Sequence, residues 1–262
     1  MDKLEKLREY LRGKKRIAVA FSGGVDSSFL LKVAHEELGD NAVAITVMSD
    51  LFPAEELQAA TGFCKTYGIK QIFLSSDIME NERFLSNPKD RCYICKRLIF
   101  SRIKNEALKH GYDIVSDGTN YDDTGDYRPG LAALEEFGVI SPLKELGFTK
   151  QEIRDYSEKI GLKYSRRQSS ACLASRIAYG EKITLDKLRK IDKGEILLRS
   201  FGIDRTRVRV HGDIVRIETS QEYLETVIRN REEIIRQLKA DGFKYITLDI
   251  EGFRSGSMNE VL

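Results

Sequence analysis

Residues 16–34 read RIAVAFSGGVDSSFLLKVA, which joins an apolar run, a glycine-rich turn and a helical pattern. The apolar run, residues 16–21, is typical of a buried parallel strand. Residues 28–34 carry apolar side chains at helical spacing, and Gly39 is a good residue to end that helix. The sequence therefore predicts a strand, a tight turn and a helix in direct succession.

The glycine-rich turn is suited to binding phosphate. At a helix N-terminus the backbone N–H groups have no helical partner, and the helix dipole favours negative charge. The two glycines of the turn also let the backbone approach a phosphate closely. We therefore take Ser22, Gly23, Gly24, Asp26 and Ser27 as candidate nucleotide-binding residues, with Asp26 also a candidate catalytic residue.

Two common phosphate motifs do not describe this turn, because it lacks both a Gly-Lys-Ser/Thr ending and GxGxxG spacing. It resembles instead the PP-loop of the N-type ATP pyrophosphatases. The resemblance implies that ATP is split between its α- and β-phosphates. In that family the loop holds the leaving pyrophosphate, and the substrate attacks the α-phosphorus to become an adenylate. A serine- and glycine-rich turn without a catalytic role is the alternative.

The composition is that of an ordinary globular chain. Its 262 residues suit one large or two modest domains, and its net charge of +2 does not by itself favour nucleic acid. No apolar run approaches the roughly 20 residues that span a bilayer, and residues 1–7 form a charged amphipathic pattern rather than a signal peptide. We therefore expect a cytoplasmic protein whose four cysteines are thiols or metal ligands rather than disulfides.

Strand and helix patterns alternate through the first two thirds of the chain. This rhythm predicts an α/β fold with a doubly wound, mostly parallel sheet and ligands at the carboxyl ends of its strands. We assign residues 1–165 to this PP-loop domain. Expected strands are residues 42–48, 71–74 and 113–116, and expected helices are residues 53–68, 94–110 and one opened by a capping box at Thr149 and ended by Gly161.

The loop DGTNYDD, residues 117–123, directly follows an expected strand. Gly118 and Thr119 are placed to approach a nucleotide, and the carboxylates suit Mg²⁺, which prefers one or two carboxylates plus phosphate oxygens. A solvated turn is the alternative. Arg128, before Pro129 at an expected helix start, is a candidate for an anionic substrate group or a surface arginine.

The pattern changes over residues 166–262, which we expect to form a small α+β domain. A helix over residues 185–201 precedes two strands, residues 208–210 and 214–217. A helix over residues 222–240, with one apolar face, then leads to a strand over residues 245–250. The expected order of elements is αββαβ.

Three cysteines are candidates for chemistry, whereas Cys64, within an amphipathic helix, suits the core. Cys92 and Cys95 form a C-x-x-C, and Cys172 lies in an irregular segment. Three thiolates suit a [4Fe–4S] cluster whose open iron carries a sulfide, whereas tetrahedral zinc needs a fourth ligand. A redox pair or unlinked thiols are further alternatives. Cys172 is also a candidate nucleophile, since Arg166, Arg167 and Arg176 lie nearby in sequence.

Four motifs occur in the order SGG-x-DS, D-G-T-N-x-D-D, R-P-G and C-L-A-S-R. With them the chain resembles, over essentially its whole length, the ATP-dependent sacrificial sulfur transferase family LarE. The resemblance implies adenylation of a carboxylate of a pyridinium mononucleotide and sulfur insertion to give a thiocarboxylate, on the route to the nickel-pincer nucleotide of lactate racemase. Cys172 matches the sulfur-supplying cysteine. The resemblance also implies a homo-oligomer.

The pair Cys92 and Cys95 departs from single-cysteine members and resembles the branch in which three cysteines bind a [4Fe–4S] cluster. We therefore favour the cluster over Cys172 itself as the sulfur source. Ser175, Arg207 and Arg209 match the substrate-phosphate site of the family that the chain resembles. Alternation along a strand places the two arginines on one face, and an exposed basic strand is the alternative.

Other functions remain as alternatives. A PP-loop tRNA thiolase would share the adenylate and the cluster but should carry a wide basic face, which the near-neutral charge does not favour. A PP-loop ammonia-dependent amidoligase would leave the three cysteines unexplained. A nucleotide-binding sensor that never turns over would use the cysteines to register iron or oxygen.

Overall fold

The computed structural model describes residues 2–125, 130–162, 171–254 and 256–260. Contacts between residues divide the chain into two compact units. The first contains residues 1–78 and 90–170, and the second contains residues 79–89 and 171–262. The expected boundary between residues 165 and 166 lies outside the described residues.

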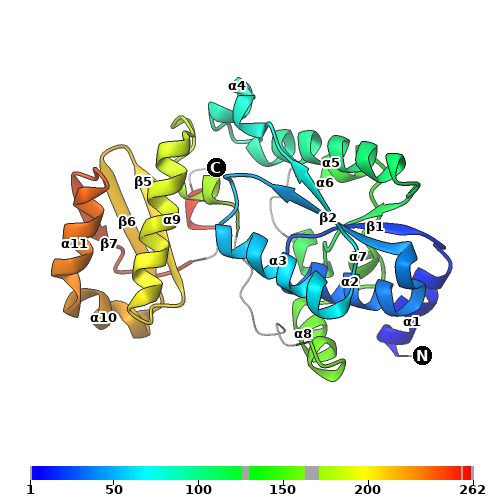
Figure 1. Cartoon of the computed structure of the whole chain (residues 1–262). Helices are drawn as coiled ribbons and strands as arrows, with labels where there is room; N and C mark the ends of the chain where they lie inside the picture. Colours follow the sequence, from blue (N-terminus) through cyan, green and yellow to red (C-terminus); the bar gives the residue numbers. More distant parts are fainter. Residues whose placement is uncertain (1, 126–129, 163–170, 255, 261–262) are drawn as a thin grey trace. The chain divides into compact units, whose positions relative to one another are not determined.

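The first unit is built on a parallel sheet with strand order β3-β2-β1-β4, as far as its described residues show (Figure 1). Ile17 pairs with Ala42 of β2, and Ala18 pairs with Val115 of β4, so β1 is a central strand. The strands are β1 (Ile17–Ala20), β2 (Ala42–Met48), β3 (Gln71–Ser75) and β4 (Val115–Ser116). The expected parallel α/β architecture is confirmed.

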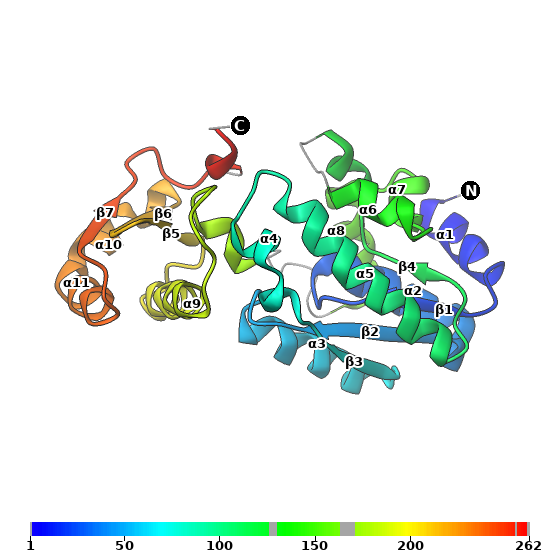
Figure 2. The same ribbon diagram turned by 90° about the horizontal axis from the view of Figure 1, so that it is seen from above.

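Helices cover both faces of this sheet (Figures 1 and 2). The helices on one face include α2 and α3, whose phenylalanines join its core, and α5 and α6 supply the core of the other face. The helices of the unit are α1 (Lys3–Arg12), α2 (Val25–Leu38), α3 (Ala54–Tyr67), α5 (Arg91–Lys109), α6 (Gly130–Glu136), α7 (Pro142–Glu145) and α8 (Lys150–Lys159).

Successive residues of β1 enter different cores. Ile17 and Val19 pack in one core with Phe29 of α2, whereas Ala18 packs in the other with Phe100 of α5. This follows from the two-residue period of a strand, and it explains why the strand is apolar at every position. Burying a side chain such as Phe29, which is fully covered, stabilises the fold by about 1.5–3 kcal/mol.

Local capping and breaking residues set several helix ends as expected. Thr149 and Glu152 form the capping box before α8, with the Thr149 side chain accepting from the Glu152 N–H. Gly68 ends α3 in the left-handed region, at φ 67°. However, α5 begins at Arg91, earlier than expected, because the first turn of a helix need not present an apolar residue to the core.

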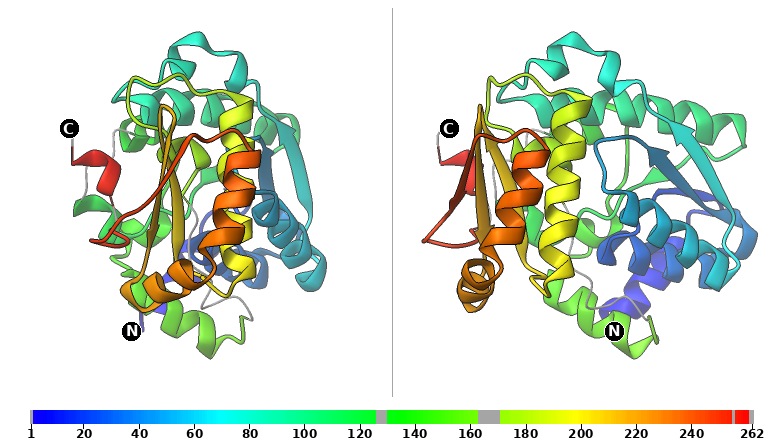
Figure 3. Two further views of the ribbon diagram at one scale, coloured as in Figure 1. Left: turned by 90° about the vertical axis from the view of Figure 1, so that its left-hand side faces the viewer. Right: turned by 60° about the vertical axis from the view of Figure 1, so that its left-hand side comes forward.

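The second unit contains a sheet with strand order β5-β6-β7 (Figure 3). Strands β5 and β6 form an antiparallel hairpin, whereas β6 and β7 are parallel. Helices α9 and α11 cover one face. The order of elements is the expected αββαβ, except that two helices, α10 and α11, take the place of the single expected one. The elements are η4 (Leu173–Arg176), α9 (Leu185–Ser200), β5 (Thr206–His211), β6 (Ile214–Thr219), α10 (Leu224–Arg229), α11 (Arg231–Ala240) and β7 (Tyr245–Leu248).

The single helix expected over residues 222–240 is wrong, because the chain breaks into α10 and α11 at Asn230. Asn230 departs from helical backbone angles, at φ −97° and ψ 13°. Its side chain donates at 2.8 Å to the Thr226 carbonyl, which also accepts from the Asn230 N–H at 3.1 Å. Part of the expected apolar face is not buried. Ile228 is 54% exposed and Ile235 is 39% exposed, while Val227, Ile234 and Leu238 are buried.

Residues 79–89 belong to the second unit, although their neighbours on both sides belong to the first. They include the short helix α4 (Glu82–Leu85). The fully buried Asn87 donates from its side chain to the carbonyls of Ile177 and Ala178, at 3.2 and 2.8 Å. Its backbone has φ 54°, a conformation that asparagine tolerates better than most residues. The periodicity of the sequence gives no sign of this attachment.

Of the helices within the described ranges, none is both long enough and apolar enough to cross a lipid bilayer.

Candidate functional site

The phosphate loop lies between β1 and α2, at the carboxyl edge of the sheet. The Gly24 N–H donates to Ser22 Oγ at 3.3 Å, and the Ser27 hydroxyl donates to the Gly24 carbonyl at 3.1 Å. The two serine oxygens are 3.2 Å apart, and Ser22 is the donor between them because the Ser27 hydroxyl already donates to the Gly24 carbonyl. These short contacts close the loop and hold the N-terminus of α2 in place for an anion.

Gly23 fits because the loop runs close to α3. Its φ is 79°, and a Cβ at this position would lie 3.0 Å from the Ala60 N and 3.1 Å from the Glu56 carbonyl oxygen. Both contacts are with backbone atoms, which have little freedom to move. A glycine is therefore required here by the backbone conformation and by the approach of α3.

The loop after β4 packs directly against the phosphate loop. A Cβ on Gly118 would lie 2.8 Å from the Ser27 backbone nitrogen, so this glycine permits the close approach of the two loops. The fully buried Asn120 then donates from its side-chain amide to Asp26 Oδ2 at 3.0 Å. The structure thus brings the two sequence-predicted nucleotide loops together.

Thr119 has a structural contact that the sequence did not reveal. Its backbone N–H donates to Asp117 Oδ1 at 3.3 Å, and its hydroxyl donates to the other Asp117 oxygen. Ser141 donates to Asp117 Oδ1 at 2.7 Å. The carboxylate of Asp117 is therefore used to fix the loop rather than to face a ligand.

Several charges surround Asp26. Burial raises the pKa of its carboxyl group, the Asn120 hydrogen bond opposes this, and Asp123 raises the pKa further. Lys150 and Arg154 of α8 act in the lowering direction, and Lys150 Nζ lies 3.1 Å from Asp123 Oδ1. Asp26 is therefore a partly buried carboxylate at the edge of the phosphate loop. Such a carboxylate suits Mg²⁺, which binds one or two carboxylates together with phosphate oxygens.

Within the described ranges, no group of three or more His, Cys, Asp or Glu side chains forms a ready metal site. Cys92 and Cys95 lie in the first turns of α5, in the first unit, with Cys92 exposed and Cys95 half-buried. Their spacing of three places both thiols on one side of the helix. Between them, the Tyr93 hydroxyl donates to Glu136 of α6 at 2.6 Å and anchors this turn.

Cys172 belongs to the second unit, where it caps the short helix η4 and is half-buried. The guanidinium of Arg176, a residue expected to lie near this thiol, binds the carboxylate of Glu195 and the carbonyls of Ala171 and Cys172. Arg166 and Arg167 lie outside the described residues. Cys64 is a core residue as predicted, and burial raises the pKa of its thiol to about 12.

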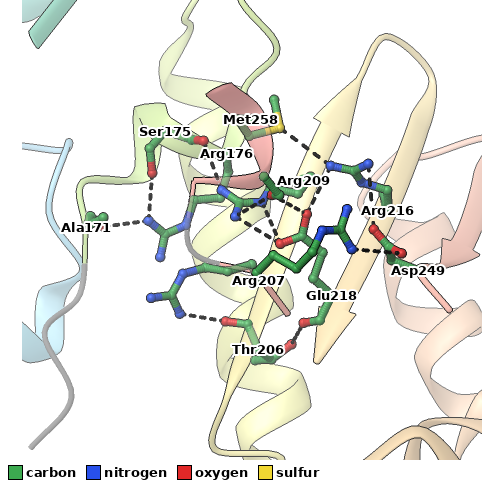
Figure 4. A network of polar contacts seen from close by, with 12 residues as sticks. Ala171, Ser175, Arg176, Thr206, Arg207, Arg209, Arg216, Glu218, Asp249 and Met258 are labelled. Atoms are coloured by element: carbon green, nitrogen blue, oxygen red, sulfur yellow. Dashed lines mark hydrogen bonds and ion pairs between the residues drawn. The ribbon is translucent and has the colours of Figure 1, made fainter. Parts of the chain in front are cut away.

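The residues expected to bind the substrate phosphate differ in their surroundings (Figure 4). Arg209 is buried and donates through Nε and Nη2 to Glu218, at 3.1 and 2.9 Å, and through Nη1 to the Ser175 carbonyl. Arg207 is half-buried, donates to the Thr206 carbonyl and lies 5.2 Å from the ring centre of Phe253. Ser175 Oγ donates to the Cys172 carbonyl at 2.8 Å.

Of the two arginines, Arg207 is the one whose positive charge is less balanced by a neighbouring carboxylate. Burial, and next the charge of Arg176, lower its pKa to about 10, against the opposing effect of Glu195. Among the described residues, no carboxylate lies at salt-bridge distance from Arg207, whereas Arg209 and Arg176 each have one. An anion could therefore take that place beside Arg207. The fourth candidate, Arg128, lies outside the described residues.

Sequence reasoning missed three residues that organise these sites: Asn120, Glu195 and Glu218. The two glutamates are almost fully buried, at 1% and 0% exposure, and each binds an arginine. A signal existed in the sequence, since Glu195 falls on the apolar face of α9 with Leu188, Ile191 and Leu198. A charged residue at an apolar position predicts a buried partner of opposite charge.

A glycine-rich turn between a parallel strand and a helix, met by a second loop at the same sheet edge, defines a nucleotide-binding α/β protein of the PP-loop class. The sequence model of the NAD synthase family agrees, and it matches residues 2–103.

Three relatives match nearly the whole chain. The pyridinium-3,5-bisthiocarboxylic acid mononucleotide synthase of Lactiplantibacillus plantarum is 37% identical over 96% of this chain and 92% of its own length. An uncharacterized protein of Synechocystis is 40% identical over 100% of this chain and 98% of its own. An uncharacterized protein of Methanocaldococcus jannaschii is 32% identical over 97% of this chain and 98% of its own length. The chain therefore belongs to the LarE family of PP-loop, ATP-using enzymes.

Proposed function

We propose that this protein adenylates a carboxylate of a pyridinium mononucleotide with ATP and then replaces AMP by sulfur, which gives a thiocarboxylate. In the first step a carboxylate oxygen attacks the α-phosphorus and pyrophosphate leaves. In the second a sulfur nucleophile attacks the activated carbonyl carbon and AMP leaves. The observation that carries the proposal is the meeting of Gly118 and Asn120 with Ser27 and Asp26 in a chain so similar to a named synthase.

The residues of the first unit have separate roles in this proposal. The backbone N–H groups around Gly24, at the N-terminus of α2, bind the pyrophosphate part of ATP. Asp26 binds Mg²⁺, which neutralises charge on the leaving pyrophosphate. Asn120 holds one oxygen of Asp26 and leaves the other for the ion. Gly118 keeps its loop close enough for this contact.

The residues of the second unit bind the other end of the substrate. Arg207 and Ser175 receive the phosphate of the mononucleotide, with Arg209 beside them. Arg128, which belongs to the first unit, binds a further anionic group. The support is the local excess of positive charge at Arg207, since the guanidinium of Arg209 already contacts Glu218. Cys172 lies one turn of η4 from Ser175, which accepts from Arg176 and donates to the Cys172 carbonyl.

The three candidate thiols fit an iron–sulfur group in their chemistry, because thiolates are the usual ligands of such clusters. Two of the thiols share one side of α5. Cys92 is exposed, and Cys95 and Cys172 are half-buried rather than in a core. Cys92, Cys95 and Cys172 would hold a [4Fe–4S] cluster. When bound, it would supply sulfide for the second step, and Cys172 would survive turnover.

A product assay with Asp26→Asn tests the adenylation step. With ATP, Mg²⁺, sulfide and pyridinium-3,5-dicarboxylic acid mononucleotide, the wild-type protein should release AMP and pyrophosphate together. Asp26→Asn should lower this release by about a hundredfold or more, because the metal loses its anionic ligand. Asp155→Asn, on the exposed side of α8, should not. Release of ADP and phosphate by the wild-type protein would overturn the proposal.

Anaerobic reconstitution tests the sulfur source separately. We expect about four iron atoms per chain, and fewer after Cys95→Ala, with Cys64→Ala as the control thiol. The intact mass after turnover should show Cys172 unchanged. Tightly bound zinc without iron, or the loss of H₂S from Cys172, would overturn the cluster while leaving the adenylation step in place.

A further inference from the structure

Arg176 uses its whole guanidinium group inside the second unit. Its side chain is 0% exposed. Nε and Nη2 donate to the two oxygens of Glu195, at 2.9 and 3.1 Å. Nη1 donates to the Ala171 carbonyl at 2.6 Å and to Ser175 Oγ at 3.0 Å (Figure 4). It also donates to the Cys172 carbonyl at 3.1 Å. One buried side chain therefore contacts the backbone on both sides of the Cys172 peptide unit.

Glu195 connects this contact to the strand that carries the candidate phosphate-binding arginines. It lies on the buried face of α9, and its Oε1 also accepts from the Val208 N–H of β5 at 3.3 Å. Val208 stands between Arg207 and Arg209 in β5. The pair of Arg176 and Glu195 thus joins three elements, η4, α9 and β5.

A buried ion pair of this kind is weak evidence for a role in stability. Removing two charges from water costs free energy that their attraction often only offsets, and apolar residues of similar size would fill the same space. The planar guanidinium offers what an apolar residue or a lysine does not: a carboxylate bound from one side and carbonyls bound from the other. The arrangement therefore serves to fix positions.

We propose that Arg176, held by Glu195, is a positioning residue that fixes the backbone of Cys172 and its turn relative to β5, and so sets where the Cys172 thiol stands with respect to Arg207. The inference deepens the proposed function, in which Cys172 and Arg207 act on one substrate, and it rests on that function. Arg176 itself touches neither substrate nor nucleotide in this role.

Differential labelling of thiols tests the position of Cys172 without any need for activity. The full chain, prepared without an iron–sulfur cluster so that iron does not compete for the thiols, is treated with N-ethylmaleimide. Peptide mass spectrometry gives the rate at Cys172 relative to Cys92, which lies in the other unit and serves as an internal standard. In Arg176→Lys, the ammonium group replaces the planar fork and the turn loosens. We expect the relative rate at half-buried Cys172 to rise by about fivefold or more.

Arg216→Lys is the matched control, because Arg216 also binds a buried glutamate, Glu218, in the same unit but does not contact the Cys172 turn. In Arg216→Lys, the labelling rate at Cys172 relative to Cys92 should stay within about twofold of wild type. In activity assays, Arg176→Lys should lower the rate of thiocarboxylate formation by about tenfold, with the KM for ATP unchanged, because the phosphate loop belongs to the other unit. A rate at Cys172 that is unchanged, or one that rises equally in both variants, would overturn the inference.

Two further measurements test the inference even if Arg176→Lys does not fold. Glu195→Gln keeps the size of the side chain but removes the charge that holds Arg176, so it should raise the labelling of Cys172 in the same way. In the wild-type protein, the Ser175 N–H, which donates to the Cys172 carbonyl at 3.0 Å, should exchange slowly with deuterium. Rapid exchange at Ser175 would contradict a fixed turn. If the wild-type chain released no pyrophosphate, the labelling would still decide the role of Arg176.

Discussion

The side-chain amide of Asn120 donates a 3.0 Å hydrogen bond to Oδ2 of Asp26, and this contact joins the loop after β4 to the first turn of α2. Burial raises the pKa of Asp26, and the bond from Asn120 counteracts that rise because it stabilises the ionised carboxylate. The ionisation of Asp26 therefore depends on a residue far away in the sequence.

Replacing Asn120 with alanine should raise the pKa of Asp26 further. Since Mg²⁺ needs the ionised carboxylate, the pH at which pyrophosphate release reaches half its maximum should move upward. A profile of kcat/KM for ATP between about pH 5 and 9 measures this. Asn105→Ala, at an exposed position of α5, is the control. An equal loss at every pH would mean that Asn120 acts on the fold and not on ionisation.

Replacing Gly23 with alanine should destabilise the first unit by about 1–3 kcal/mol, because the residue would be forced to keep a positive φ with its Cβ against backbone atoms of α3. Urea unfolding followed by circular dichroism gives the free energy of unfolding. The control is Gly62→Ala in α3, whose Cβ meets nothing within 4 Å and should stabilise by about 0.5–1 kcal/mol. Equal stability of the two variants would contradict the geometry of the loop.

The substitution Gly118→Ala should weaken ATP binding by about tenfold or more, because the added Cβ would push its loop away from Ser27 and pull Asn120 from Asp26. Equilibrium dialysis with labelled ATP measures the affinity. Gly13→Ala has its nearest contact at an ordinary 3.5 Å and should bind ATP like the wild type. Unchanged affinity in Gly118→Ala would show that the two loops separate without cost to the nucleotide.

The ion pair of Arg176 and Glu195 should make stability depend on acid. Burial raises the pKa of Glu195, but the charge and hydrogen bonds of Arg176 outweigh burial, so the pKa in the folded protein lies below the ordinary 4.5. The stabilisation is therefore complete above the unfolded value and is lost as the pH falls through the folded value. Urea unfolding near pH 7, 5 and 4 should show a steeper loss for wild type than for Glu195→Gln. Parallel losses would assign the acid sensitivity to other groups.

Local patterns were enough to predict much of the fold. The strand, turn and helix over residues 16–38, the capping box at Thr149 and the two strands β5 and β6 each depend on neighbours in sequence, and the structure contains them all. The break at Asn230 was missed because an apolar period continues through it, and a change of backbone angles at one residue leaves that period intact.

The attachment of residues 79–89 to the second unit was beyond the reach of these patterns. Its contacts join Asn87 to Ile177 and Ala178, some 90 residues away. Such contacts are made by single polar groups, and a single polar group leaves no period in the sequence.

The sequence by itself determined the parallel α/β layers and the glycine-rich turn between β1 and α2, because the periods of strands and helices and the freedom of glycine are local properties. Only the tertiary structure decided which polar side chains meet: the amide of Asn120 with Asp26, and the ion pairs of Arg176 with Glu195 and Arg209 with Glu218. A buried charge requires a partner, but which residue supplies it depends on how distant elements pack, and no local pattern records that choice.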